Sequence, residues 1–315
     1  MSTASIDSSC QVSFNNLAYN LNRLKIKYMK TNQVRYHNTI VNGLNIFYRE
    51  AGPKDAPTIL LLHGYPTSSF MYRNLIPVLG NKYHVVAPDL PGFGFSDAPA
   101  RAKFDYTFDN LAKAMQGFID KLELKRFAVY IFDYGAPVGL RLALANQEKI
   151  TGIISQNGNA YEEGLSSEWN PLQKYWKEPT EGNRESLRQF MGIHITRFQY
   201  EHGVADTSLI APDTYTLDQH FLDKPEHIDI QLDLILDYRT NVAKYPDFQC
   251  YFRDRKPPVL AVWGNQDPYF LPAGAEGYKK DNPNATVKFY DTGHFALETH
   301  ADEIGEDVLN FLDSL

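Results

Sequence analysis

Cysteine is scarce in this sequence, and long hydrophobic runs are absent. The 315 residues contain two cysteines, Cys10 and Cys250, which lie far apart along the chain. This spacing fits neither a disulfide framework nor a zinc pattern, and it favours a reducing compartment, which we predict to be the cytoplasm. No apolar run approaches the roughly 18 residues that a membrane span needs, so we expect no transmembrane segment.

Positive charge is also in the minority. Lysine and arginine total 31 against 38 aspartates and glutamates, a net charge of −7. This balance lacks the basic field that attracts nucleic acid, so we expect no nucleic-acid partner. The histidines do not cluster with carboxylates in a metal-site pattern, and neither a metal nor a cofactor is implied. Hydrophobic and charged fractions of 43% and 22% are typical of a globular protein.

Acidic residues are nearly missing from the first 35 residues, where Asp7 is the one acid. This stretch has no apolar centre of the kind found in secretory signals. An acid-poor, basic start also occurs in organelle presequences, and that alternative stays open. We interpret residues 1–35 as an N-terminal extension.

From Arg35 onward, short β-branched runs alternate with longer amphipathic segments, a pattern that predicts a mostly parallel sheet covered by helices. The alternation stops between residues 160 and 255, where helical spacings dominate and prolines, as at Tyr245-Pro246, are expected to interrupt the helices. We therefore predict an α/β core (residues 36–159 and 256–315) with a helical cap insertion (residues 160–255). The expected strands are Ile46–Glu50, Thr58–Leu62, His84–Pro88, Phe127–Phe132, Ile150–Gln156, Val259–Trp263 and Thr286–Tyr290.

The predicted strand Phe127–Phe132 runs directly into Asp133, with small residues at positions 135, 136 and 139. Such residues let a strand turn sharply into a helix and expose the side chain at the apex, the geometry of a nucleophile elbow. The apex residue is Asp133, and the chain contains no Gly-x-Ser-x-Gly. Taken alone, Asp133 is also compatible with an acid that caps the following helix.

An aspartate at this position changes the predicted reaction. A serine that attacks a saturated carbon forms an ether, which water does not cleave. A carboxylate that attacks the same carbon forms an ester, which an activated water can hydrolyse. Asp133 therefore points to substitution at sp³ carbon, as in epoxide opening or halide displacement.

Two further candidates follow predicted strands. Asp267 comes shortly after Val259–Trp263, and His294 follows Thr286–Tyr290. The chain order nucleophile, acid, histidine is the order of α/β-hydrolases. His294 would act as general base on water, and Asp267 would orient it. Singly, Asp267 is compatible with a turn residue and His294 with a surface histidine.

The tetrapeptide His63-Gly-Tyr-Pro66 follows the strand Thr58–Leu62. We expect the backbone N–H groups of Tyr65 and Tyr134 to form an oxyanion hole. Pro66 is a candidate for a cis peptide bond.

Together, His-Gly-x-Pro at 63–66, the aspartate elbow at 133, Asp267-Pro268 and Gly-His-Phe at 293–295 resemble the α/β-hydrolase superfamily, within its epoxide hydrolase and haloalkane dehalogenase branch, over residues 36–315. The resemblance implies an α/β-hydrolase fold and a two-step hydrolysis through an alkyl-enzyme ester on Asp133. Further residues expected in the substrate pocket are His63, Pro66, Tyr175, Trp176 and Phe295.

Within this branch, epoxide hydrolases protonate the leaving alkoxide with cap tyrosines. Tyr238 lies in a stretch similar to one family motif, whereas Leu172 stands where the second tyrosine is expected. Dehalogenases usually place Trp after the nucleophile and often Asn in the first loop, where this chain has Tyr134 and Tyr65. The resemblance thus favours an epoxide hydrolase that gives a vicinal diol.

The predicted substrate is a small apolar or amphiphilic molecule. A haloalkane or haloacid dehalogenase is the alternative enzyme, and a small-ligand receptor without turnover is the alternative from another class. The oligomeric state stays open, with a homodimer among the options.

Overall fold

The computed structural model describes residues 33–315. The predictions that concern residues 1–32, including Cys10 and most of the N-terminal extension, lie outside the described residues. The first strand begins at Arg35, one residue before the predicted start of the core.

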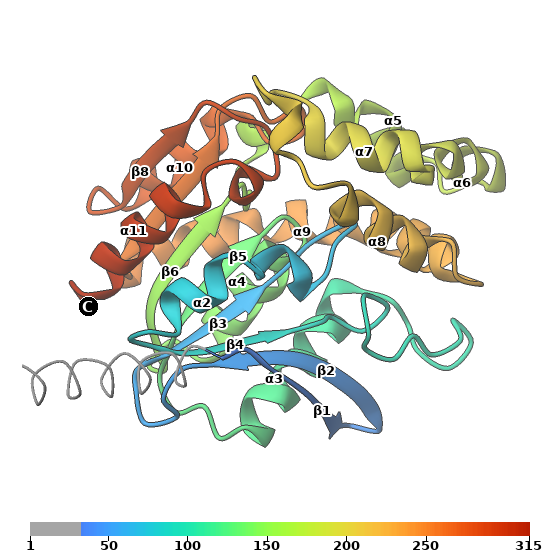
Figure 1. Cartoon of the computed structure of the whole chain (residues 1–315). Coiled ribbons are helices and arrows are strands. Elements are labelled where there is room, and N and C mark those ends of the chain that lie inside the picture. Colours follow the sequence, from blue (N-terminus) through green and yellow to red (C-terminus); the bar gives the residue numbers. More distant parts are fainter. Residues whose placement is uncertain (1–32) are drawn as a thin grey trace, which may run out of the picture.

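A single eight-stranded sheet forms the centre of the molecule (Figure 1), in the order β1-β2-β4-β3-β5-β6-β7-β8. The strand β2 pairs antiparallel with β1 and β4, and all other neighbours are parallel, which confirms a mostly parallel sheet. The seven expected strands are present, five of them with the expected bounds. The strands are β1 Arg35–Val41, β2 Leu44–Ala51, β3 Thr58–Leu62, β4 His84–Pro88, β5 Phe127–Phe132, β6 Ile150–Gln156, β7 Val259–Gly264 and β8 Thr286–Tyr290.

Strand β1 was not expected from the sequence. It lies at the edge of the sheet, and of its residues only Val41 is buried, while Tyr36 and Ile40 are 62% and 61% exposed. An edge strand with so little buried surface has no apolar run for a sequence pattern to detect.

The central strand β5 is buried on both faces. Val129 and Ile131 pack in one hydrophobic cluster with α3 and α4, whereas Tyr130 and Phe132 pack in a second cluster with α2 and α11. Each large apolar side chain buried in this way contributes about 1.5–3 kcal/mol, so the carboxyl end of β5 is held firmly. The helices around the sheet are α2 Leu75–Leu79, α3 Phe108–Lys121, α4 Gly135–Ala145, α10 Pro272–Asp281 and α11 Ala301–Leu312.

Residues 160–255, which we call the helical segment, connect β6 to β7. Its named elements are helices and short 3₁₀ turns, as expected, and Figure 1 shows α5, α6 and α7 as a layer above the sheet. The division of the chain into a core and a cap domain stays a proposal. Among residues 33–315, no helix combines the length and the apolar character that crossing a membrane requires. The helices are α5 Asn170–Lys177, α6 Glu181–Arg188, α7 Ile193–Glu201, α8 Pro212–Leu222 and α9 His227–Arg255.

The break expected at Tyr245-Pro246 is wrong, because α9 runs through Pro246. A proline inside a helix costs about 3 kcal/mol. Its neighbours Tyr245 and Phe248 are 2% and 1% exposed, and burying two such aromatic side chains contributes a similar amount. Packing therefore keeps α9 continuous.

Candidate active site

The chain turns sharply after β5. Asp133 has a φ of +48°, in the left-handed region, and α4 begins two residues later at Gly135. A Cβ on Gly135 would lie 2.1 Å from the Leu62 carbonyl oxygen, and one on Gly64 would lie 2.3 Å from Asp133 Oδ1. Glycine at both positions is therefore required for this close approach. The N-terminus of α4 has no side-chain cap, so the Asp133 carboxylate does not serve as one.

Two main-chain N–H groups act on the Asp133 carboxylate. The Tyr65 N–H donates to Oδ1 at 2.6 Å, and the Tyr134 N–H also lowers the pKa of Asp133. The Tyr65-Pro66 peptide bond is cis, as expected. The structure thus places both amides predicted for the oxyanion hole beside the predicted nucleophile.

His294 lies between two carboxylates. Its Nδ1 is 2.7 Å from Asp267 Oδ2, and its Nε2 is 4.0 Å from Asp133 Oδ2. The three residues follow β5, β7 and β8, whose carboxyl ends meet at one edge of the sheet. Because Oδ1 of Asp133 is held by the Tyr65 N–H, Oδ2 is the oxygen available for bond formation, and it faces His294.

Asn157 belongs to this site, although the sequence reasoning missed it. It follows β6 with a φ of +44°, and its Nδ2 donates to Asp267 Oδ2 at 2.7 Å. Its Oδ1 accepts from the Gly264 N–H, which fixes the amide orientation. The signal was available, since Asn157 is a polar residue directly after a predicted strand, like Asp133. It positions Asp267 and, through it, His294.

Burial and the neighbouring charges set the protonation of the site. Burial raises the pKa of Asp133 to about 6, although His294 and the Tyr65 and Tyr134 N–H groups lower it. Burial lowers the pKa of His294, but Asp267, with a smaller contribution from Asp133, outweighs burial and raises this pKa above its usual value. Esterification of Asp133 would remove its charge and so bring the His294 pKa down, which favours the neutral imidazole that a general base requires.

A cavity of about 230 Å³ opens against Asp133 and His294. An apolar cavity of about 150 Å³ holds benzene, so this volume fits a small molecule. Besides these two residues, Glu168 and Gln199 are the only lining side chains that are neither aromatic nor aliphatic, and no lysine or arginine occurs in this described lining. The described cavity wall therefore offers no lysine or arginine to a substrate carboxylate. The lining residues are Tyr65, Asp133, Tyr134, Glu168, Trp169, Pro171, Leu172, Phe190, Met191, Ile195, Phe198, Gln199, Ile235, Tyr269 and His294.

The expected pocket residues His63, Pro66 and Phe295 do not line this cavity. All three are buried, and the side chains of His63 and Phe295 contact residues outside the cavity lining. His63 Nε2 accepts a hydrogen bond from the Leu90 N–H, and the Phe295 ring stacks on Tyr200 with a centroid distance of 3.8 Å. These side chains support the walls of the site from behind.

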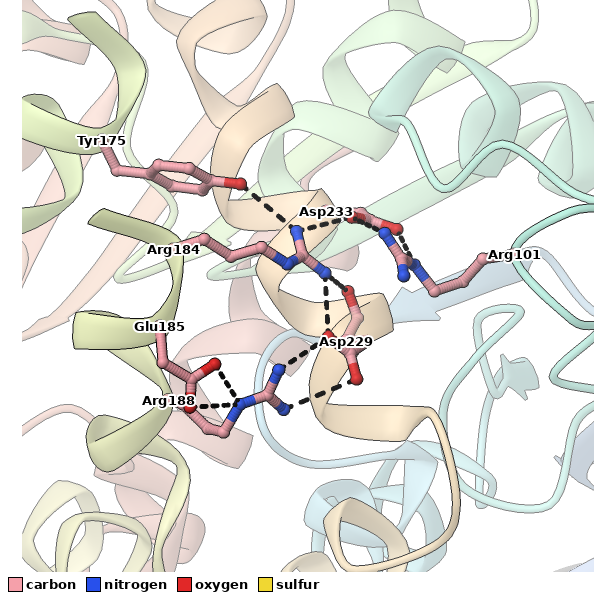
Figure 2. Close-up of polar contacts among 7 residues, drawn as sticks. All are labelled: Arg101, Tyr175, Arg184, Glu185, Arg188, Asp229 and Asp233. Atoms are coloured by element: carbon pink, nitrogen blue, oxygen red, sulfur yellow. Dashed lines mark hydrogen bonds and ion pairs between the residues drawn. The ribbon is translucent and has the colours of Figure 1, made fainter. Parts of the chain in front are cut away.

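Tyr175 and Trp176, also expected in the pocket, face other helices instead. The Tyr175 hydroxyl accepts a hydrogen bond from Arg184 of α6 at 3.2 Å (Figure 2). Trp176 Nε1 donates to the Ile235 carbonyl at 2.6 Å. The sequence identified the right helix, α5, but not which of its faces reaches the cavity.

Figure 2 shows the ionic network that holds this region in place. Arg184 and Arg188 of α6 bond to Asp229 of α9, and Arg184 also bonds to Asp233. Arg101, from the loop between β4 and α3, bonds to the same Asp233. The network therefore joins α6, α9 and a loop of the sheet layer, and it fixes the wall that the helical segment contributes to the cavity.

Tyr238 is buried behind the cavity wall and is not one of the lining residues. Its hydroxyl lies 3.5 Å from that of Tyr245, and its ring packs against Trp169 with a centroid distance of 4.5 Å. The tyrosines that line the cavity are Tyr65, Tyr134 and Tyr269.

Within residues 33–315, no group of three or more histidine, cysteine, aspartate or glutamate side chains is arranged to hold a metal ion.

Comparison with known proteins identifies the family to which this fold belongs. A family model described as the alpha/beta hydrolase fold matches residues 57–301. An uncharacterized hydrolase of Saccharomyces cerevisiae is 48% identical over 281 residues, which cover 88% of this chain and 96% of that protein. A haloalkane dehalogenase of Psychrobacter cryohalolentis is 41% identical over 115 residues, 36% of this chain and 38% of the dehalogenase.

Solved structures agree in fold at low sequence identity. The epoxide hydrolase CorEH has a TM-score of 0.74 at 17% identity and covers 90% of this chain and 99% of its own. The haloalkane dehalogenase DbeA from Bradyrhizobium elkani has a TM-score of 0.70 at 21% identity, with coverage of 90% and 98%. The chain therefore belongs to the α/β-hydrolase family.

Proposed function

We propose that this hydrolase opens small apolar or amphiphilic epoxides to vicinal diols through a covalent ester on Asp133. One observation carries the proposal. The residue at the turn after β5 is a carboxylate whose Oδ1 accepts from the Tyr65 N–H, while His294 Nε2 lies 4.0 Å from Oδ2 at the wall of a largely apolar cavity. This arrangement suits attack on a saturated carbon followed by hydrolysis of an ester.

In the first step, Asp133 Oδ2 bonds to an epoxide carbon and the ring carbon–oxygen bond breaks. The ring oxygen takes a proton from a tyrosine. In the second step, His294 removes a proton from water, and the hydroxide adds to Asp133 Cγ. Negative charge then develops on Oδ1, where the Tyr65 and Tyr134 N–H groups stabilise it.

Collapse of this intermediate breaks the bond between Cγ and Oδ2. The departing diol oxygen takes the proton from the His294 imidazolium, and the remaining proton of the water returns to the tyrosinate. Asp267 stabilises the imidazolium and fixes the histidine tautomer, and Asn157 holds Asp267 in position.

The proton donor must lie within hydrogen-bond reach of the leaving oxygen. Tyr238, the candidate from sequence, is behind the wall, so in our proposal the role passes to Tyr65 or Tyr269, which line the cavity. Burial raises the pKa of both phenols, so both carry a proton at neutral pH. The Tyr65 hydroxyl donates to the Met191 sulfur at 2.8 Å, a weak acceptor that a substrate oxygen can replace.

We expect Tyr65→Phe or Tyr269→Phe to slow epoxide opening by about 100-fold, because an alkoxide leaves poorly without a proton. Tyr238→Phe is expected to have little effect. The rate of ester formation in a single turnover measures this step directly. A halide leaves as a stable anion, so the same variants should release halide from a haloalkane at the wild-type rate. A large loss in Tyr238→Phe alone would return the donor role to Tyr238.

Dehalogenation is the second candidate, and the similarity to named haloalkane dehalogenases supports it. Parallel panels of epoxides and haloalkanes, with diol and halide as the measured products, decide between the two. Halide release with no diol formation would replace the epoxide proposal. Tight binding of a small apolar ligand without turnover on either panel would favour a receptor.

The pH dependence follows from the two buried groups. Asp133 must be ionised to attack, and its pKa is raised to about 6, so kcat/KM is expected to fall as pH decreases through about 6. His294 must be neutral for the second step, so kcat should also fall as pH decreases. In the ester, burial still lowers and Asp267 still raises the pKa of His294, but the contribution of the Asp133 charge is lost. Profiles of kcat/KM and kcat between pH values of about 5 and 9 check both expected decreases. A kcat/KM that stays constant down to pH 5 would contradict the assignment.

A further inference from the structure

Gln199 is a buried amide without a partner. It lies on α7, is 4% exposed and lines the cavity, and no hydrogen bond joins its side chain to another of the described residues. Another buried glutamine, Gln219 of α8, differs in this respect. Its Oε1 accepts from Thr196, and its Nε2 donates to the Met191 carbonyl. Gln199 therefore differs from Gln219 in that its amide has no partner within residues 33–315 and borders the cavity.

The surroundings of Gln199 connect it to the catalytic histidine. The next residue, Tyr200, stacks on Phe295, which directly follows His294. Two residues beyond Tyr200, the His202 carbonyl oxygen is so close to Gly293 that a Cβ there would lie 1.8 Å from it. The end of α7 is thus fixed against the turn that carries His294, and Gln199 belongs to the adjoining wall.

The chemistry of this wall defines a ligand class. A ligand that fills the cavity displaces water from it. A purely apolar ligand then leaves the Gln199 amide unpaired, which is unfavourable for a buried polar group, whereas a neutral oxygen on the ligand restores the hydrogen bond. A substrate anion is disfavoured, because it would lose its hydration and meet no lysine or arginine in this described lining.

We propose that Gln199 recognises a neutral oxygen on the substrate, such as a hydroxyl, ether or carbonyl oxygen, in addition to the reacting group. The substrate class is then an amphiphile with an apolar body and one such oxygen. This assignment deepens the proposed function, and it depends on that function in so far as the ligand is called a substrate. The binding site itself can be tested without any reaction.

The test uses two unreactive probes of nearly equal shape, 2-phenylethanol and propylbenzene, which differ in a hydroxyl against a methyl group. Their dissociation constants are measured with the full-length protein from the change in tryptophan fluorescence on binding, since one of the three tryptophans, Trp169, lines the cavity. Gln199→Met keeps the length of the side chain and removes the amide. It is expected to shift the ratio of the two constants by about 10-fold against the alcohol, because the alcohol alone loses a partner.

Gln189→Met is the matched control. Gln189 is exposed, bonds to the Ser186 carbonyl and does not line the cavity, so its substitution should leave the ratio unchanged. Thermal melting checks that each variant is folded. If Gln199→Met does not fold, Gln199→Leu serves as a second apolar variant. The proposal is overturned if the ratio of the two dissociation constants in the folded apolar variant equals the wild-type ratio. This holds whether the binding of both probes weakens equally or the binding of neither weakens. If the ratio shifts but epoxides form no ester on Asp133, the oxygen-binding site is supported and the proposed reaction is refuted.

Discussion

Replacing His294 with glutamine is expected to stop turnover after the first step and to leave the substrate esterified to Asp133. Asp133 Oδ2 needs no base in order to attack, because the carboxylate is already ionised above its pKa of about 6. Hydrolysis of the ester does need one, since water is a poor nucleophile until His294 removes its proton. General-base catalysis of this kind contributes about 10²–10⁴-fold, so the second step should slow by a comparable factor while ester formation persists.

The ester is measured as a mass increase on the peptide that contains Asp133, equal to the whole mass of the epoxide. Equality of mass is informative, because an epoxide adds without losing atoms, whereas a haloalkane adds without its halogen. His220→Gln is a suitable control, since His220 is exposed and lies outside the cavity lining. It should turn over normally and show no adduct. A His294→Gln protein that consumes one equivalent of epoxide and yields an unmodified peptide would contradict the covalent mechanism.

The parts of this site that the sequence predicts are those fixed by strands. Asp133 and Asp267 follow β5 and β7, which are buried along their whole length, and His294 follows the edge strand β8, which pairs in register with β7. The ends of such strands in a parallel sheet meet at one edge. Position along the chain then determines position in space, and the three residues converge as expected.

The helical segment is less predictable because a helix presents several faces. Whether Tyr175 or Leu172 of α5 reaches the cavity depends on how α5 rotates against α9, and the bond from Arg184 to Tyr175 is a tertiary contact with no local signal. Gln199 was missed for a related reason. A single polar residue on an amphipathic helix is usually solvent-exposed, and only the packing of α7 against the His294 turn shows that this one is not.

Replacing Asp133 with asparagine is expected to abolish ester formation altogether, the largest effect among these predictions. The amide retains an oxygen that can accept from the Tyr65 N–H, so the turn should keep its geometry. However, an amide group is far less nucleophilic than a carboxylate, and the His294 base has no ester on which to direct its water. We expect neither an adduct nor diol above background. Intact folding of the variant is checked by thermal melting.

The fate of oxygen in the wild-type protein tests the same bond from the other side. In a single turnover in ¹⁸O-labelled water with protein in excess, the diol should carry an unlabelled oxygen from Asp133 Oδ2, because hydrolysis breaks the bond between Cγ and Oδ2 and not the new carbon–oxygen bond. The water oxygen should therefore appear in the Asp133 carboxyl group. Label found in the diol, with none in the Asp133 peptide, would mean that water attacks the substrate directly and that Asp133 acts as a base.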